Sequence, residues 1–172
     1  MTRTYIGIDP GPRTSGLVVY ELGPRGHGRI RSCWKEADLE QVRCVLGTAP
    51  QGVVVCIECT QAGPPSTAVV KTTEVVGRLM ERCDLLGLEH HEYYRREVLQ
   101  ALGCARQGNK DSHVRNALIE LHGGTKQVAV GKKSAPGPLY GLSSHAWQAL
   151  GVVAAHTLPW TPTHNHNTEG TP

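Results

Sequence analysis

Short apolar runs separated by turn-forming residues open the chain. Residues 5–8 (YIGI), 16–22 (GLVVYEL) and 28–34 (GRIRSCW) are divided by the Pro/Gly-rich stretches DPGPRTS and GPRGHG. Apolar runs of this length bounded by Pro and Gly are typical of β-strands, and short turns between them favour pairing of successive strands as hairpins. This part of the chain therefore predicts a three-stranded antiparallel meander.

A helix and a buried strand are expected next. Leu39, Val42 and Leu46 recur at helical spacing behind Asp38, a residue type that commonly caps helices. Residues 52–58 (GVVVCIE) are apolar without alternation, which is typical of a strand buried on both faces. We therefore expect this strand to lie in the middle of a sheet.

The remaining pattern predicts helices around one further strand. Helical periodicity runs from Pro65 to Leu86, where Gly87 favours an end to the helix. Residues 88–94 (LEHHEYY) then predict an edge strand. Three shorter helices are expected after it, at 95–102, at 112–121, and from an N-cap at Ser143 or Ser144 to about His156.

Two polar segments lie outside these elements. The stretch 123–141 is basic and rich in Gly and Pro, which predicts a mobile segment. Residues 159–172 are polar and predict a disordered tail. The chain of 172 residues is long enough for one domain with a substantial core, so the pattern indicates a single α/β domain over residues 1–158.

Composition argues against membrane-spanning and secreted classes. Hydrophobic residues make up 39% of the chain and charged residues 19%, as in soluble globular proteins. No apolar run approaches the roughly 20 residues of a membrane span, and MTRTYIGID lacks the pattern of a signal peptide. Cys56 and Cys59 form a CxxC without the second pair that a zinc site would need. We therefore expect a cytoplasmic protein with reduced thiols.

Basic residues are few but clustered. The net charge is +3, and the sequence contains 12 Arg and 6 Lys. They gather at residues 25–31, 95–96, 106–110 and 126–133. Clusters of this kind are compatible with nucleic-acid binding, because each cation can contact a backbone phosphate independently of base sequence.

Two carboxylates stand at the ends of apolar strands. Asp9 ends the first predicted strand and Glu58 ends the buried one. Burial of a carboxylate is costly unless it is hydrogen-bonded or bound to a cation. If the two strands are neighbours, both carboxylates reach one edge of the sheet and can share a divalent ion. Asp9 alone has a second interpretation, as a turn-capping residue before Pro10-Gly11.

Four stretches together resemble the RuvC-type Holliday-junction resolvases of the ribonuclease H-like superfamily. GIDPGPRTSGLVVY is similar to the first strand of that family, and VVCIE to the fourth strand with its Glu. YYRREVLQALG with GNKDSHVRNAL resembles the middle region, and HAWQALGVVAAH resembles the last helix. The resemblance covers residues 5 to 156. It implies an α/β, ribonuclease H-like fold whose five-stranded mixed sheet, in strand order 3-2-1-4-5, is flanked by helices.

The resemblance also implies a metal site and a nuclease activity. Position by position, the catalytic and metal-binding residues of the family correspond to Asp9, Glu58, His145 and Gln148, where Gln148 replaces the usual Asp. Two divalent ions, Mg²⁺ or Mn²⁺, would lie roughly 3.5–4 Å apart there. Imidazole in place of carboxylate favours softer ions, so we expect higher activity with Mn²⁺. Asp111 is a candidate compensating ligand or, alternatively, a helix cap.

The implied partner is branched DNA, a four-way junction cut by a homodimer with paired sites. Lys110 resembles the DNA-contacting lysine of the family. The chain lacks the family's aromatic residue after the strand-four Glu and contains no Phe, so Tyr93, Tyr94 or Tyr140 would have to supply stacking. The predicted nucleic-acid-binding residues are Lys110, Arg95, Arg96, Arg106, Lys132 and Lys133.

Three alternatives remain open at this level. A broader ribonuclease H-like nuclease for branched DNA or RNA processing would use the same site on other substrates. A non-catalytic junction-binding relative is favoured by Gln148, and a small-molecule kinase or ATPase by the GIDPGPRTSG stretch, although such enzymes normally need two domains of this kind. His156 lies eleven residues after His145, about 16 Å along a helix, and is excluded from the predicted site.

Overall fold

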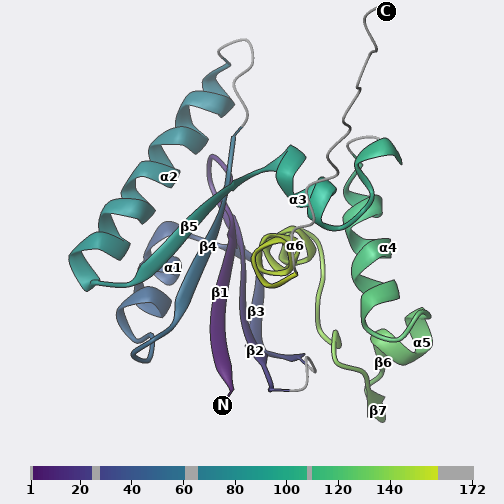
Figure 1. Ribbon diagram of the computed structural model, residues 1–172. Helices are drawn as coiled ribbons and strands as arrows, with labels where there is room; N and C mark the ends of the chain where they lie inside the picture. Colours follow the sequence, from purple (N-terminus) through teal and green to yellow (C-terminus); the bar gives the residue numbers. More distant parts are fainter. Residues whose placement is uncertain (1, 25–27, 61–65, 108–109, 159–172) are drawn as a thin grey trace, which may run out of the picture.

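A five-stranded sheet forms the centre of the computed structural model, which describes residues 2–24, 28–60, 66–107 and 110–158 (Figure 1). The strand order is β3-β2-β1-β4-β5. Strands β1, β2 and β3 pair antiparallel, whereas β4 and β5 run parallel to β1. The predicted mixed sheet and its order are confirmed. The strands are β1 (Arg3–Asp9), β2 (Ser15–Leu22), β3 (Gly28–Ala37), β4 (Val54–Cys59) and β5 (Glu89–Tyr94).

Helices cover both faces of the sheet. Helices α1 and α2 lie on one face, and α3, α4 and α6 lie on the other (Figure 1). The longer helices are α1 (Leu39–Gly47), α2 (Thr67–Leu86), α3 (Arg95–Ala101), α4 (Asp111–Leu121) and α6 (Ala146–Thr157).

Strand β4 is buried on both sides, which explains its continuous apolar sequence. Val55 and Ile57 belong to the hydrophobic cluster under α1 and α2. Val54 and Cys56 belong to the cluster under α6. Successive side chains of a strand point to opposite faces, so a central strand needs apolar residues at every position.

Helix α6 packs directly on β1. A Cβ atom at Gly7 would lie 2.1 Å from the backbone oxygen of Ala149 and 2.7 Å from Cγ2 of Val153. Every residue of α6 from Ala146 to Ala155 is buried. The absence of a side chain at Gly7 therefore allows the helix to approach the strand closely, and this contact fixes the height of α6 above the sheet.

Local signals set most helix ends. Asp38 accepts a hydrogen bond from the backbone N–H of Gln41, whose side chain accepts one from the Asp38 backbone, so this predicted cap is confirmed. Helix α2 ends at Gly87, which adopts a left-handed conformation with φ of 63°. The last helix begins later than predicted, with His145 as N-cap, because Ser144 has a positive φ of 45°.

The prediction that residues 123–141 form a mobile segment is wrong, because the structure shows ordered elements there. It contains the short helix α5 (Lys126–Ala129) and a two-stranded ribbon formed by β6 (Gly131–Lys132) and β7 (Ala135–Pro136). Leu139 is fully buried, and its backbone N–H donates to the Ala129 carbonyl at 2.8 Å. Burial of this side chain orders a stretch whose Gly and Pro content alone predicts mobility. A 3₁₀ turn, Ala105–Gln107, likewise occupies the loop before α4.

Other sequence expectations have different outcomes. All six cysteines are free thiols, as expected. Within the described parts of the chain, no helix combines the length and apolarity needed to cross a membrane. The predicted tail at 159–172 lies outside the described residues.

Candidate functional site

Asp9 and Glu58 lie side by side at the carboxyl ends of β1 and β4. The two strands are parallel neighbours, and Ile8 pairs with Ile57, so the next residue of each strand reaches the same edge of the sheet. The Asp9 side chain is 18% exposed and the Glu58 side chain 12%. The convergence predicted for neighbouring strands is therefore present.

His145 contacts Asp9 from the N-terminal end of α6. Its Nδ1 lies 3.2 Å from Asp9 Oδ2, and its side chain is half exposed. Strand β2 allows this approach, because a Cβ atom at Gly16 would lie 2.3 Å from the backbone oxygen of His145. The close contact between Gly16 and His145 brings the imidazole to the edge of the sheet.

Gln148 is buried one turn further along α6, with 4% of its surface exposed. Its Oε1 accepts a hydrogen bond from Arg95 Nη1. Its Nε2 donates to the backbone oxygen of Asp111 at 3.4 Å. Both ends of the amide are thus engaged, and Gln148 connects α6 to α3 and α4.

Arg95 lies inside the group of acidic residues. Its Nη2 is 2.7 Å from Asp111 Oδ1 and its Nη1 is 3.6 Å from Glu58 Oε1. Only 13% of its side chain is exposed. The charge clusters of the sequence predict Arg95 as a phosphate contact, and the structure places its guanidinium among these acidic residues. The register of β5 on β4, with Glu58 opposite Tyr93, is what brings the start of α3 to this edge, and sequence alone does not reveal that register.

Burial makes both strand-end carboxylates hard to ionise. Burial raises the pKa of Asp9 to about 6, and the neighbouring His145 only partly opposes the shift. Burial, together with the charge of Asp9, raises the pKa of Glu58 to about 7, against the lowering effect of Arg95. Glu58 Oε2 is buried and has no hydrogen-bond partner among the described residues. A cation at this position would supply the missing interaction.

The donor set fits a divalent ion. Carboxylate oxygens of Asp9 and Glu58, including the unpaired Oε2, are ligand types found in Mg²⁺ and Mn²⁺ sites, and a ring nitrogen of His145 shifts the preference toward the softer Mn²⁺. The oxygens expected to complete a second ion site belong to Gln148 and Asp111, and both accept hydrogen bonds from Arg95. A second ion would therefore have to compete with this guanidinium.

The raised pKa values predict a pH dependence of stability in the absence of divalent ions. The folded chain binds protons at Asp9 and Glu58 more tightly than the unfolded chain, whose values are near 3.8 and 4.5. The free energy of unfolding should therefore fall as the pH rises from 4.5 to 7, by on the order of 4 kcal/mol. Urea denaturation in EDTA across this range measures the slope.

The matched variant for this experiment is Glu58→Gln, which keeps the shape of the side chain and removes its titration. We expect a flatter pH profile in this variant. Saturating Mg²⁺ should flatten the wild-type profile too, because the ion favours the ionised carboxylates. A wild-type slope that persists unchanged in Glu58→Gln would contradict this origin.

A cleft with a volume of about 610 Å³ opens beside His145 and Gln148. Arg115 and Lys126 contribute basic groups to its lining. The Arg115 guanidinium lies 5.6 Å from the ring centre of Trp147, a cation–π contact that holds it at the cleft. Sequence reasoning missed Arg115, although its position four residues after Asp111 on one helix face was an available signal.

The other predicted nucleic-acid-binding residues are distributed around this region. Lys110, Arg106, Lys132 and Lys133 are exposed. Arg96 lines a separate cavity of about 970 Å³ between α2 and β5. The consecutive residues Arg95 and Arg96 therefore lie in different environments. DNA contact by these residues stays a prediction.

Comparison with solved structures identifies the fold. RuvC from Thermus thermophilus in complex with a Holliday junction substrate superimposes with a TM-score of 0.63 at 18% sequence identity, covering 91% of this chain and 93% of that chain. This chain has the ribonuclease H-like fold of RuvC. A second Thermus thermophilus RuvC structure gives a TM-score of 0.65 at 19% identity, with coverage of 92% and 94%.

The similarity to RuvC lies in the three-dimensional structure. No family model matches the sequence, and no curated protein matches it either. The fold predicted from the RuvC-like motifs is confirmed over more than nine-tenths of the chain, whereas the roles of the site residues rest on the geometry described above.

Proposed function

We propose that the chain is a metal-dependent, structure-selective endonuclease that resolves four-way DNA junctions in the cytoplasm as a homodimer. The observation that carries this proposal is the meeting of Asp9, Glu58 and His145 at one sheet edge. It is supported by the RuvC fold, since one similar structure is a RuvC in complex with a Holliday junction substrate. Two opposed cuts in a two-fold symmetric junction suit two copies of this site.

The ligands have distinct roles in the proposed reaction. Two bound divalent ions would activate the attacking water and stabilise the leaving oxygen of the phosphodiester. Asp9, Glu58 through its unpaired Oε2, His145 and Gln148 would hold the ions. Nδ1 of His145 is hydrogen-bonded to Asp9, so Nε2 is the nitrogen of that ring that would bind an ion.

Arg95 has a positioning role in this proposal. Its hydrogen bonds to Gln148 Oε1 and Asp111 Oδ1 hold these two oxygens in place at the site. Its guanidinium also places a permanent positive charge beside the carboxylates. A charge held in advance near the reacting phosphate stabilises the negative charge that develops there during hydrolysis.

The basic cleft provides the route for DNA. Arg115 and Lys126 line it next to His145, and exposed Lys110, Lys132 and Lys133 extend the positive surface. Contacts of this type bind phosphates and carry no sequence information. We therefore expect salt-sensitive binding whose selectivity comes from the shape of the junction.

A second candidate function is non-catalytic junction binding. The specific observation in its favour is again Arg95, which occupies hydrogen-bonding oxygens of both Gln148 and Asp111. A site in which a guanidinium serves as the resident cation would bind divalent ions weakly. The same cleft would still bind branched DNA.

Cleavage assays on labelled substrates separate these functions. A four-way junction, a duplex, a Y-fork and a single-stranded RNA are each incubated in Mg²⁺ and in Mn²⁺ at matched concentrations. We expect paired symmetric nicks in the junction, faster in Mn²⁺ because an imidazole ligand favours the softer ion. Equal or faster cleavage in Mg²⁺ would contradict the ion preference.

Other outcomes support the alternatives. Cleavage that extends to the Y-fork or the RNA would indicate a broader ribonuclease H-like nuclease. Tight junction binding without cleavage in either ion would indicate the non-catalytic function.

A further inference from the structure

Glu89, His91 and His156 gather away from the carboxylate site. Glu89 and His91 lie in the first half of β5, whereas the last residues of that strand lead to the site. Helix α6 runs antiparallel to β1, with His145 near Asp9 and His156 near Tyr5, whose ring centre is 5.7 Å away. The group is therefore about 16 Å along α6 from His145.

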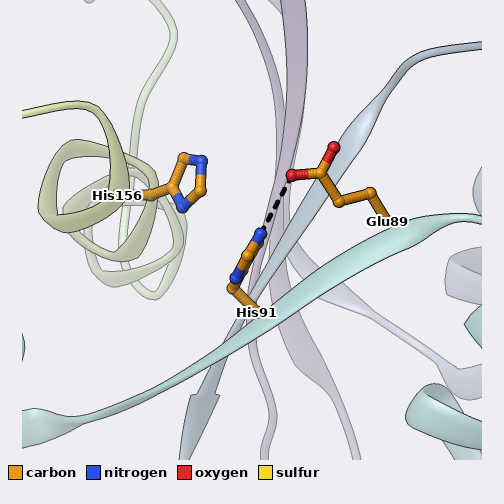
Figure 2. A group of neighbouring side chains, drawn as sticks. All are labelled: Glu89, His91 and His156. Carbon is orange, nitrogen blue, oxygen red and sulfur yellow. Dashed lines mark hydrogen bonds and ion pairs between the residues drawn. The ribbon is translucent and has the colours of Figure 1, made fainter.

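The three side chains point toward one another from two elements (Figure 2). Glu89 and His91 share a face of β5 because they are two residues apart, and Glu89 Oε1 lies 3.0 Å from His91 Nε2. The ring centres of His91 and His156 are 4.6 Å apart. One ligand atom from each of the three residues lies within 4.8 Å of the other two.

Neighbouring groups orient these ligands in the manner of a metal site. The hydroxyl of Tyr93 lies 2.8 Å from Nδ1 of His156, which fixes the ring and leaves Nε2 for a ligand. Arg3 Nη2 donates to Glu89 Oε2 at 3.1 Å, which leaves Oε1 toward His91. Hydrogen bonds from outer residues to ligand histidines and carboxylates are a regular feature of metal sites.

We propose that Glu89, His91 and His156 form a second metal site, which binds a transition-metal ion of the Zn²⁺ class and links β5 to α6. Two imidazoles and one carboxylate with an open fourth position are a common Zn²⁺ ligand set. Tetrahedral bonds of about 2.0–2.1 Å place ligand atoms about 3.3 Å apart, so only small side-chain rotations are needed from the observed arrangement. Two nitrogen ligands against one carboxylate disfavour Mg²⁺ here, whereas the carboxylate site has two carboxylates and a single imidazole.

A metal here would act on stability. The ion would join the edge strand that leads to Arg95 and the helix that carries His145 and Gln148. Because it would bind the folded chain preferentially, it should raise the melting temperature in proportion to the logarithm of its concentration. This site does not depend on the proposed nuclease activity.

The test is Zn²⁺ titration by calorimetry and Co²⁺ titration by visible absorption, with the full chain in excess Mg²⁺. We expect wild-type protein to bind one ion that His91→Gln and His156→Gln lose, and the Co²⁺ spectrum to show tetrahedral bands without thiolate charge transfer. Tyr93→Phe, which retains the ring, should weaken Zn²⁺ binding by about tenfold. Zn²⁺ should raise the melting temperature of wild type and leave that of His91→Gln unchanged.

Two control variants address other imidazoles. His90 is the neighbouring residue of the same strand and, by alternation, lies on its opposite face, so His90→Gln should bind Zn²⁺ like wild type. The double variant His164→Ala/His166→Ala removes both histidines of the polar C-terminal stretch and should also bind Zn²⁺ like wild type. Binding that survives in folded His91→Gln and His156→Gln, or that is lost only in a control variant, would overturn the proposal.

Discussion

Replacement of Asp9 by asparagine is expected to reduce cleavage of a four-way junction by about a thousandfold or more, since loss of ion-mediated stabilisation removes several kcal/mol from the transition state. Asparagine retains the shape of the side chain and loses the negative charge beside Glu58 and His145. Single-turnover cleavage of a labelled junction measures the rate, and a mobility-shift assay measures junction binding. Binding should change little, because the proposed DNA contacts lie in the basic cleft.

The fold should tolerate this change. Ionised Asp9 is unfavourable in its buried position, as its raised pKa of about 6 indicates, so Asp9→Asn should be at least as stable as wild type at pH 8 without divalent ions. Asp38→Asn is the matched control, because Asp38 is an exposed helix cap and asparagine caps helices equally well. Cleavage by Asp9→Asn within tenfold of wild type would contradict the assignment of Asp9 to the metal site.

Gly7→Ala is expected to lower the free energy of unfolding by about 3 kcal/mol, at the upper end of the cost of overpacking a core. The added Cβ would lie 2.1 Å from the backbone oxygen of Ala149, and neither β1 nor α6 can move without disturbing the buried face between them. Urea denaturation monitored by circular dichroism measures the loss.

The control for Gly7→Ala lies on the other side of the sheet. Gly77 is exposed on α2, and a Cβ atom there would meet nothing within 4 Å. Gly77→Ala should therefore raise stability by about 0.5–1 kcal/mol, because alanine favours the helix. Equal stability of the two alanine variants would show that α6 does not press on β1 as described.

The sheet and the carboxylate pair were predictable because their signals are local. The unbroken apolar run before Glu58 indicates a central strand. A carboxylate at the end of such a strand is costly to bury unless it is hydrogen-bonded or bound to a cation. Asp38 and Gly87 mark helix ends through the hydrogen bonds and backbone conformation that those residue types favour.

The parts that escaped prediction depend on contacts between distant segments. Leu139 orders the basic segment because it inserts into a core built by other elements. Arg95 reaches the carboxylates through the register of two strands, which no local pattern encodes. His156 was correctly separated from His145 along the helix, yet its neighbours Glu89 and His91 belong to another element and were found only in the structure.

The position of α6 in the chain has a consequence for biosynthesis. The hydrogen bond that joins His145 to Asp9 spans 136 residues, and α6 follows all five strands of the sheet. Contacts between such distant residues form late because closing the long loop costs entropy. On the ribosome, all five strands are synthesised before α6, which covers one face of their sheet. A nascent chain would therefore carry Asp9 and Glu58 without their partners from α6, and the proposed nuclease activity would arise only as translation of the domain finishes.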